Sequence, residues 1–292
     1  MNAPLSLPPF PPNPTFGQRF GNWVWNGSRW VCTGSSGLRI ATTVFNASAP
    51  YTPAPGLMYV EVEAYGGGGG GGGAGPAPSA LYMMSGGGGG SGGYSRATLA
   101  AALVAGGVNV TIGLGGLGGV PPCLVGGAQG GATTFGAMVV AIGGLGGGTA
   151  AGVAGAYAGS SGNGANPGTG DLASPGASGT FGALVILTAL ATNTAQGALG
   201  GQINGGNRTT ATETGGVVNG APPVPNSAAG GTGGCVNQVN GGEAQGSSGA
   251  TGLCIVTEYI WADAADDGCG CAPTSGAARV AIGWQGGGFD DE

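Results

Sequence analysis

The sequence contains no histidine and no lysine, and only 6% of its 292 residues are charged. All basic residues are arginines, and the net charge is −6. Proteins that bind nucleic acid neutralise phosphates with clustered basic side chains, so this composition argues against a nucleic-acid partner. General-base catalysis would depend on carboxylates or cysteines alone, because histidine and lysine are missing. We therefore expect a protein that is not an enzyme and has no cofactor.

Long apolar runs are also missing. No stretch of about 18 apolar residues could span a bilayer, and the N-terminal residues lack the basic and apolar regions of a secretory signal peptide. The six cysteines are scattered along the chain, and the pair Cys269 and Cys271 is too closely spaced for a zinc ribbon. We expect free or packed thiols and no metal site. If the protein leaves the cell, we expect it to leave with a particle released by lysis.

Glycine and proline, by contrast, are abundant: 73 glycines and 19 prolines make up close to a third of the chain. Such a share usually indicates disorder. Disordered chains combine low hydrophobicity with high net charge, however, whereas 41% of these residues are apolar. We predict an ordered chain. Because each ordered residue costs about 1–2 kcal/mol of backbone entropy and glycine loses the most, we also expect oligomerisation or a covering partner.

Residues 1–50 are predicted to be an N-terminal attachment segment. Residues 1–16 are rich in proline, which favours an extended conformation suited to docking along another surface. A β-hairpin is predicted next, because Asn26-Gly27 lies between aromatic strand formers and suits a type I′ turn. Three tryptophans of this hairpin are expected to pack in a small core or an oligomer seam rather than to stack on a ligand: Trp23, Trp25 and Trp30.

Alternating apolar residues predict several strands in the rest of the chain. In the first of them Val60 and Val62 face one way and Glu61 and Glu63 the other. These carboxylates have no evident basic partner, so we expect them on a solvent-facing edge. Residues 181–190 are predicted as either helix or buried strand. The predicted strands cover residues 58–65, 94–99, its neighbour 108–113, 133–142, 253–260 and 278–284.

The glycine runs Gly66–Gly73 and Gly86–Gly90 lie between these strands, and residues 114–120 repeat every three residues as Leu-Gly-Gly. Polyproline II geometry has three residues per turn, so Leu114, Leu117 and Val120 are predicted to form one apolar stripe while the glycine faces pack against other such helices. The predicted fold is mainly β: a small β scaffold with long glycine-rich loops and polyglycine II-like segments. A glycine-rich domain covers residues 51–260, and residues 261–292 form an acidic extension with a final strand.

Strand-like and glycine-rich motifs follow one another in a fixed order along the chain. They are Val60–Gly73, Gly92–Leu99, Val108–Gly119, Gly131–Gly136, Gly170-Asp171-Leu172 and Gly252–Tyr259. This order resembles the glycine-rich domain of bacteriophage tail fibres and tail-tip adhesins over residues 57–260. The resemblance implies a protein exposed on the virion tail, often trimeric, whose distal loops touch the host surface. Residues 261–292 have no counterpart in it, whereas the tryptophan hairpin is similar to small attachment modules of such fibres.

We therefore expect a tail fibre or adhesin that binds a host-surface glycan or outer-membrane protein, with other tail proteins as partners and a homotrimeric assembly. The alternative is a structural connector or decoration protein without receptor contact. An ice-binding or matrix protein would show a regular tripeptide repeat and a secretion signal. The expected contact segments are residues 77–84, 156–166 and 204–214, although the tip at 82–84 could instead pack on the domain. The candidate receptor contacts are Tyr82, Met83, Met84, Tyr157, Asn163, Asn166, Asn207 and Arg208.

Overall fold

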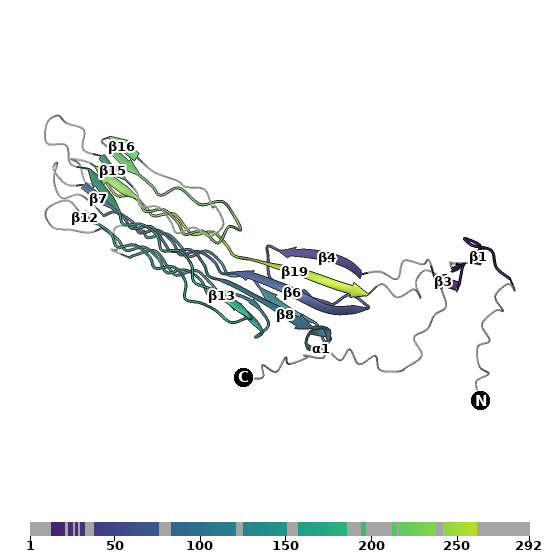
Figure 1. The fold of residues 1–292 in the computed structure, drawn as a ribbon. Coiled ribbons are helices and arrows are strands. Elements are labelled where there is room, and N and C mark those ends of the chain that lie inside the picture. The colour runs from purple at the N-terminus through teal and green to yellow at the C-terminus, as the bar shows by residue number, and fades with distance from the viewer. Residues whose placement is uncertain are drawn as a thin grey trace, which may run out of the picture. The chain divides into compact units, whose positions relative to one another are not determined.

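The chain divides into two compact units in a computed structural model of the protein (Figure 1). The larger unit runs from Arg39 to Ile260. Its boundary lies earlier than residue 50, because β4 (Leu38–Phe45) and β5 (Ala49–Tyr51) pair with its sheets. The structure describes residues 13–20, 23–25, 27–28, 30–32, 38–75, 83–120, 125–150, 157–185, 194–196, 212–214, 216–237 and 242–261.

The smaller unit contains the predicted hairpin. β1 (Arg19–Phe20), β2 (Trp23–Trp25) and β3 (Trp30–Cys32) form an antiparallel sheet in that order. The predicted hairpin is confirmed, but the prediction of a two-residue type I′ turn is wrong. Trp25 pairs with Trp30, so four residues connect the strands, among them Gly27 with a φ of 96°. The predicted strand at 278–284 lies outside the described residues, as does most of the acidic extension.

A five-stranded sheet forms one end of the larger unit. Its order is β13 (Leu172–Ser174), β8 (Tyr94–Ala100), β6 (Leu57–Tyr65), β19 (Leu253–Trp261) and β4. β6 pairs antiparallel with both β8 and β19 over almost its whole length. The strands predicted at 58–65, 94–99 and 253–260 are therefore confirmed. Their alternation gives the sheet one buried and one outer face, as expected for an antiparallel sheet.

A second sheet packs on the buried face. Its order is β11 (Val139–Ala141), β10 (Thr133–Phe135), β9 (Val108–Thr111) and β5, and the four-residue helix α1 (Ala101–Val104) connects β8 to β9. Two predictions are wrong here. β9 pairs with β5 and β10 and not with β8. Residues 133–142 form a hairpin, because Gly136 turns the chain with a φ of 54°.

The hydrophobic core lies between these two sheets. Val60, Val62 and Val256 point into it from the first sheet, and Phe135 and Val139 from the second. The buried carboxylate of Glu258 accepts hydrogen bonds from the Tyr51 hydroxyl at 2.8 Å and the Ala54 N–H at 2.9 Å. These bonds tie the chain before β6 to β19, since a buried carboxylate must be hydrogen-bonded to be tolerated.

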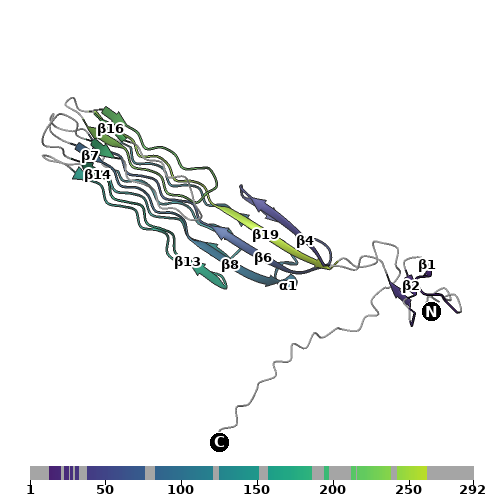
Figure 2. The same ribbon diagram turned by 45° about the horizontal axis from the view of Figure 1, so that its top comes forward.

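Glycine segments run away from this end of the unit side by side (Figure 2). Segment 66–73 lies at their centre. Its successive N–H groups donate to three segments in turn: Gly66 to Gly93, Gly67 to Gly131 and Gly68 to Ala250. Gly69, Gly70 and Gly71 repeat the same cycle of partners. A cycle of three matches the three residues per turn of polyproline II and its lack of internal hydrogen bonds, so the predicted period is confirmed.

Six segments surround segment 66–73, since its carbonyls accept from three further segments. Neighbours within this ring are also bonded to each other, so the ring closes: Gly90 to Leu145, Gly130 to Gly144, Ala128 to Leu117, Gly249 to Gly116, Ala250 to Ala229 and Gly89 to Gly231. We call this assembly the glycine bundle. In order around the centre, the ring segments are 86–93, 143–148, 126–131, 113–119, 244–252 and 228–234. Segments 159–166 and 176–182 lie outside the ring against 86–93.

Close packing of these backbones explains the eight consecutive glycines. A Cβ on Gly69, Gly70 or Gly71 would overlap the carbonyl oxygen of Leu145, Leu117 or Thr232, each in a different neighbour. Every position of segment 66–73 faces another backbone because the segment is surrounded on all sides. At the rim, segment 113–119 has three bonded neighbours, and every third residue from Leu114 to Val120 is a leucine or valine.

α1 is the single helix in the described part of the chain, and it is far too short to cross a bilayer. Of residues 181–190, Ala183–Val185 form strand β14, and the residues after Val185 lie outside the described ranges. The larger unit is thus mainly β, with a two-sheet sandwich that continues into the glycine bundle.

Candidate functional site

The bundle end away from the five-stranded sheet, here called the distal end, carries short strands from separate glycine segments (Figure 1). β12 (Tyr157–Ala158), β7 (Met83–Ser85), β18 (Cys235–Asn237) and β17 (Gly216–Val218) form one sheet in that order. β14, β15 (Thr194–Gln196) and β16 (Thr212–Thr214) form another. The described residues that flank 76–82, 151–156 and 197–211 lie at this end. The three predicted contact segments therefore reach one end of the unit.

Met84 closes the bundle at the distal end and is not an exposed contact. Its side chain is 1% exposed and packs with one buried residue from each of four other segments. The expectation of a receptor contact at Met84 is wrong for this reason, and the alternative, packing on the domain, is what the structure shows. The cluster partners are Ala74, Ala150, Val236 and Ala244.

The other candidate contacts within the described ranges are divided between the distal end and the side of the bundle. Met83 lies on β7 and Tyr157 on β12, and these strands pair in parallel. Asn163 and Asn166 are exposed on segment 159–166, one turn apart. Asn163 follows Tyr157 by six residues, about 19 Å at 3.1 Å per residue, so the asparagines lie along the side of the bundle. Tyr82, Asn207 and Arg208 lie outside the described residues.

The tryptophans belong to the smaller unit. Trp23 and Trp25 alternate on β2, and Trp30 of β3 lies directly opposite Trp25. The register thus brings the three residues together in one small sheet, while their proposed part in attachment stays a prediction.

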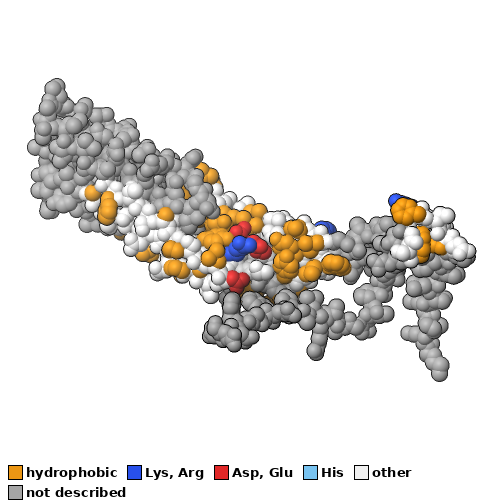
Figure 3. Space-filling model, in the orientation of Figure 1, with side chains coloured by type: hydrophobic (Ala, Val, Ile, Leu, Met, Phe, Trp, Pro, Cys, Tyr) orange, Lys and Arg blue, Asp and Glu red, His pale blue; other side chains and the backbone are white. Residues whose placement is uncertain are grey.

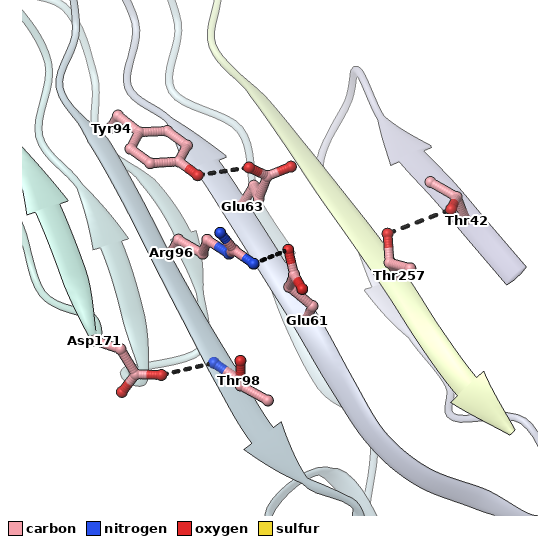
Figure 4. A network of polar contacts seen from close by, with 8 residues as sticks. All are labelled: Thr42, Glu61, Glu63, Tyr94, Arg96, Thr98, Asp171 and Thr257. Atoms are coloured by element: carbon pink, nitrogen blue, oxygen red, sulfur yellow. Dashed lines mark hydrogen bonds and ion pairs between the residues drawn. The ribbon is translucent and has the colours of Figure 1, made fainter. Parts of the chain in front are cut away.

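The outer face of the five-stranded sheet holds a polar cluster that the sequence did not reveal. Arg96 of β8 makes an ion pair with Glu61 of β6 at 2.7 Å, and the Tyr94 hydroxyl donates to Glu63 at 2.5 Å. Figure 4 shows both pairs crossing diagonally between the two strands. The charged side chains gather in one small patch with hydrophobic side chains around it (Figure 3).

Two further contacts extend this polar cluster to the sheet margins. The Asp171 carboxylate accepts from the Thr98 N–H at 2.8 Å, and the hydroxyls of Thr42 and Thr257 lie 3.3 Å apart (Figure 4). Stacked rings of Tyr59 and Tyr259, with centroids 4.3 Å apart, lie at one end of the face. Side-chain contacts on the outer face therefore link β8, β6, β19 and β4, and Asp171, the residue before β13, bonds to the backbone of β8.

The predicted edge position of Glu61 and Glu63 is wrong, because β6 is the central strand and Arg96 lies directly across from Glu63. The alternation of Tyr94, Arg96 and Thr98 was visible in the sequence, but only the strand register shows which carboxylate each meets. Burial, followed by the hydrogen bond to Glu63, raises the pKa of Tyr94. The hydrogen bond to Glu61 raises the pKa of the Arg96 guanidinium. The carboxylates of Glu61 and Glu63 are thus already bonded within the chain, to Arg96 and Tyr94.

Within the described ranges, no three of the acidic or cysteine side chains gather closely enough to hold a metal ion. The buried thiol of Cys254 lies on the inner face of β19. Burial raises the pKa of this thiol to about 12. Because the thiolate is the reactive form, Cys254 is inert in the folded chain.

The shifted groups predict a loss of stability in alkali. Below about pH 8 the Cys254 thiol is protonated in both the folded and the unfolded chain. Above this, the unfolded chain releases the thiol proton while the folded chain keeps it, so the free energy of unfolding falls as pH rises toward 12. Raised pKa values of Tyr51 and Tyr94 act in the same direction above pH 10. We expect the melting temperature to be flat from pH 6 to 8 and to fall above pH 9.

Thermal melts across this pH range test the expectation. Cys254→Ala should reduce the decline between pH 9 and 10, which lies below the ordinary pKa of tyrosine. An unchanged decline in that variant would show that the thiol is not its source.

A family model of the glycine-rich domain matches residues 42–288. The chain belongs to this family. No curated protein matches the sequence. The match begins in β4 and includes the later strands of both sheets and the whole glycine bundle, which confirms the glycine-rich domain expected from the motif order. It also extends beyond residue 260, so most of the extension that lacked a counterpart falls within the family match.

Proposed function

We propose that this glycine-rich protein is a bacteriophage tail-fibre or tail-tip adhesin of the virion tail, which binds a host-surface glycan or outer-membrane protein with its distal end. The observation that carries the proposal is that the described strands of the three candidate contact segments, β7, β12 and β16, lie at one end of the glycine bundle. Binding residues are commonly found on loops that a rigid scaffold positions. Here the scaffold is the bundle, whose backbone bonds leave almost no freedom at its centre.

The smaller unit suits attachment. The proline-rich start of the chain and the tryptophan hairpin belong to a unit separate from the glycine-rich domain. We propose that they bind other tail proteins and that the assembled protein is a homotrimer. Separation of attachment and contact into different parts of the chain is what an adhesin requires.

Labelling of bacteria by the purified, fluorescently tagged protein tests the function. We expect labelling restricted to certain strains of the source habitat, and untagged protein should compete it away. Replacing residues 204–208 with a Gly-Ser segment of equal length should reduce labelling at least tenfold, because this segment joins two distal strands. Arg96→Gln is the matched control, since Arg96 lies on the outer face of the sheet at the opposite end.

Each contrary result has a distinct meaning. No labelling of any strain by folded protein would favour the structural connector or decoration protein. Labelling that survives the replacement but is lost in Arg96→Gln would place the receptor on the outer face of the sheet. Circular dichroism of both variants confirms that the sheets are retained.

A further inference from the structure

One side of the glycine bundle carries an exposed apolar stripe. It consists of Leu114, Leu117 and Val120, whose exposed fractions are 71%, 72% and 52%. Val125, 58% exposed, continues the apolar surface next to segment 126–131, which runs antiparallel beside segment 113–119. Contiguous exposed apolar surface of this kind marks an interaction site in soluble proteins.

The stripe is exposed because of where its segment lies. A Cβ on Gly115 or Gly118 would overlap the backbone of segment 244–252, and a Cβ on Gly116 would overlap segment 126–131. Only the third position of each turn is free of a neighbour. Among the described residues, segment 113–119 makes backbone hydrogen bonds to three segments, all on its inner side, and none covers its outer side.

Outward positions on two other segments of the bundle are polar. On segment 244–252 the exposed residues of successive turns are Gln245 and Ser248. On segment 159–166 they are Asn163 and Asn166. The backbone geometry is the same at these outward positions and at those of the stripe. The geometry therefore does not require leucine in the stripe. The polar residues of segments 244–252 and 159–166 suit a surface exposed to water, whereas the leucines of the stripe suit an apolar partner.

The absence of charge around the stripe limits the kind of partner that can bind there. Residues 97–170, which include the stripe and its neighbour, contain no acidic or basic residue. A charged partner surface would lose water here without gaining a counter-charge, which is costly. A second copy of this chain presents the same uncharged surface, and its net charge of −6 lies on other parts of the sequence. Copies therefore meet here without repulsion between like charges.

Shape supports the same partner. The stripe side chains recur every three residues, about 9.3 Å apart at 3.1 Å per residue, with glycines between them. An identical stripe has the same spacing, so two copies can place their apolar side chains against one another along its whole length. A self-complementary patch is what association between identical subunits uses.

We propose that the apolar stripe is the surface by which copies of this chain associate, stripe against stripe. It supplies an interface for the homotrimer included in the proposed function, but its test uses purified protein alone. Failure of receptor binding and failure of this interface are thus separate results.

Light scattering after size-exclusion chromatography measures the association. We expect the wild-type protein to have two or three times the 27.3 kDa mass of one chain. Leu114→Ser with Leu117→Ser should return the mass to one chain and weaken association at least tenfold. Leu103→Ser is the matched control: Leu103 on α1 is 63% exposed but lies away from the stripe. Its variant should keep the wild-type mass.

Two results would overturn the proposal: a wild-type protein of single-chain mass at all concentrations, or an oligomer that the double variant leaves intact. A photo-crosslinking residue at position 117 provides a test in which the fold is not weakened. Crosslinks between copies that map to residues 114–125 support the interface, and crosslinks that map elsewhere on the partner copy contradict it.

Discussion

Gly70→Ala is expected to abolish the cooperative thermal unfolding of the glycine-rich domain. The new Cβ would overlap the Leu117 carbonyl oxygen. Gly70 cannot move away, because its N–H donates to Ala128 at 2.9 Å and its carbonyl accepts from Gly147 at 2.8 Å, which fixes it in two further directions. We expect a cost above about 4 kcal/mol, in the range reserved for severe core disruption.

Gly106→Ala is the matched control. A Cβ at Gly106 meets nothing within 4 Å, and its backbone is not in the left-handed region. The same chemical change should therefore alter the free energy of unfolding by less than about 0.5 kcal/mol. Calorimetry of both variants measures this difference in the free energy of unfolding. If Gly70→Ala unfolded like the wild type, segment 66–73 would not be surrounded as described.

Phe135→Ala is expected to destabilise the domain by about 3–5 kcal/mol. The Phe135 side chain is fully buried between the two sheets, and its ring centroid lies 5.3 Å from that of Tyr51. Truncation removes apolar contact and leaves a cavity that the surrounding strands fill only in part. For a domain of this size the loss corresponds to a fall of about 10 °C in melting temperature.

Phe181→Ala tests whether burial is the cause. The Phe181 side chain is 69% exposed on segment 176–182. Its truncation should change the melting temperature by no more than about 2 °C. Equal losses in the two variants would contradict the position of the core between the sheets.

Strand positions and inner faces could be predicted where alternation was strong. In β6 the inward residues Val60, Val62 and Ala64 are apolar and are separated by Glu61 and Glu63, so the pattern alone defines the buried side. In β19 the alternation is weaker, because Ile255 faces outward and Glu258 faces inward. The pattern failed at residues 133–142, because apolar residues continue on both sides of Gly136 and hide the turn. It also failed at Met84, where an apolar residue between two glycine runs fits a tip and a bundle cap equally well.

The polar cluster of the outer face needed information that no local pattern carries. Glu61 and Arg96 lie 35 positions apart in the sequence, and a shift of one residue in strand register would turn Arg96 to the other face. The register follows from pairing along the whole of β6 and β8.

The sequence by itself determined the period of three, the requirement for glycine and the alignment of Leu114, Leu117 and Val120 in one stripe, because each depends on a residue and its immediate neighbours. Only the tertiary structure decided which segments meet. Gly68 bonds to Ala250 and Gly67 to Gly131, yet every such bond joins one backbone N–H to one backbone carbonyl. These groups are the same in every residue except proline, so the bonds themselves do not distinguish one segment from another. The arrangement is selected by the strands at both ends and by the few positions where a side chain has room.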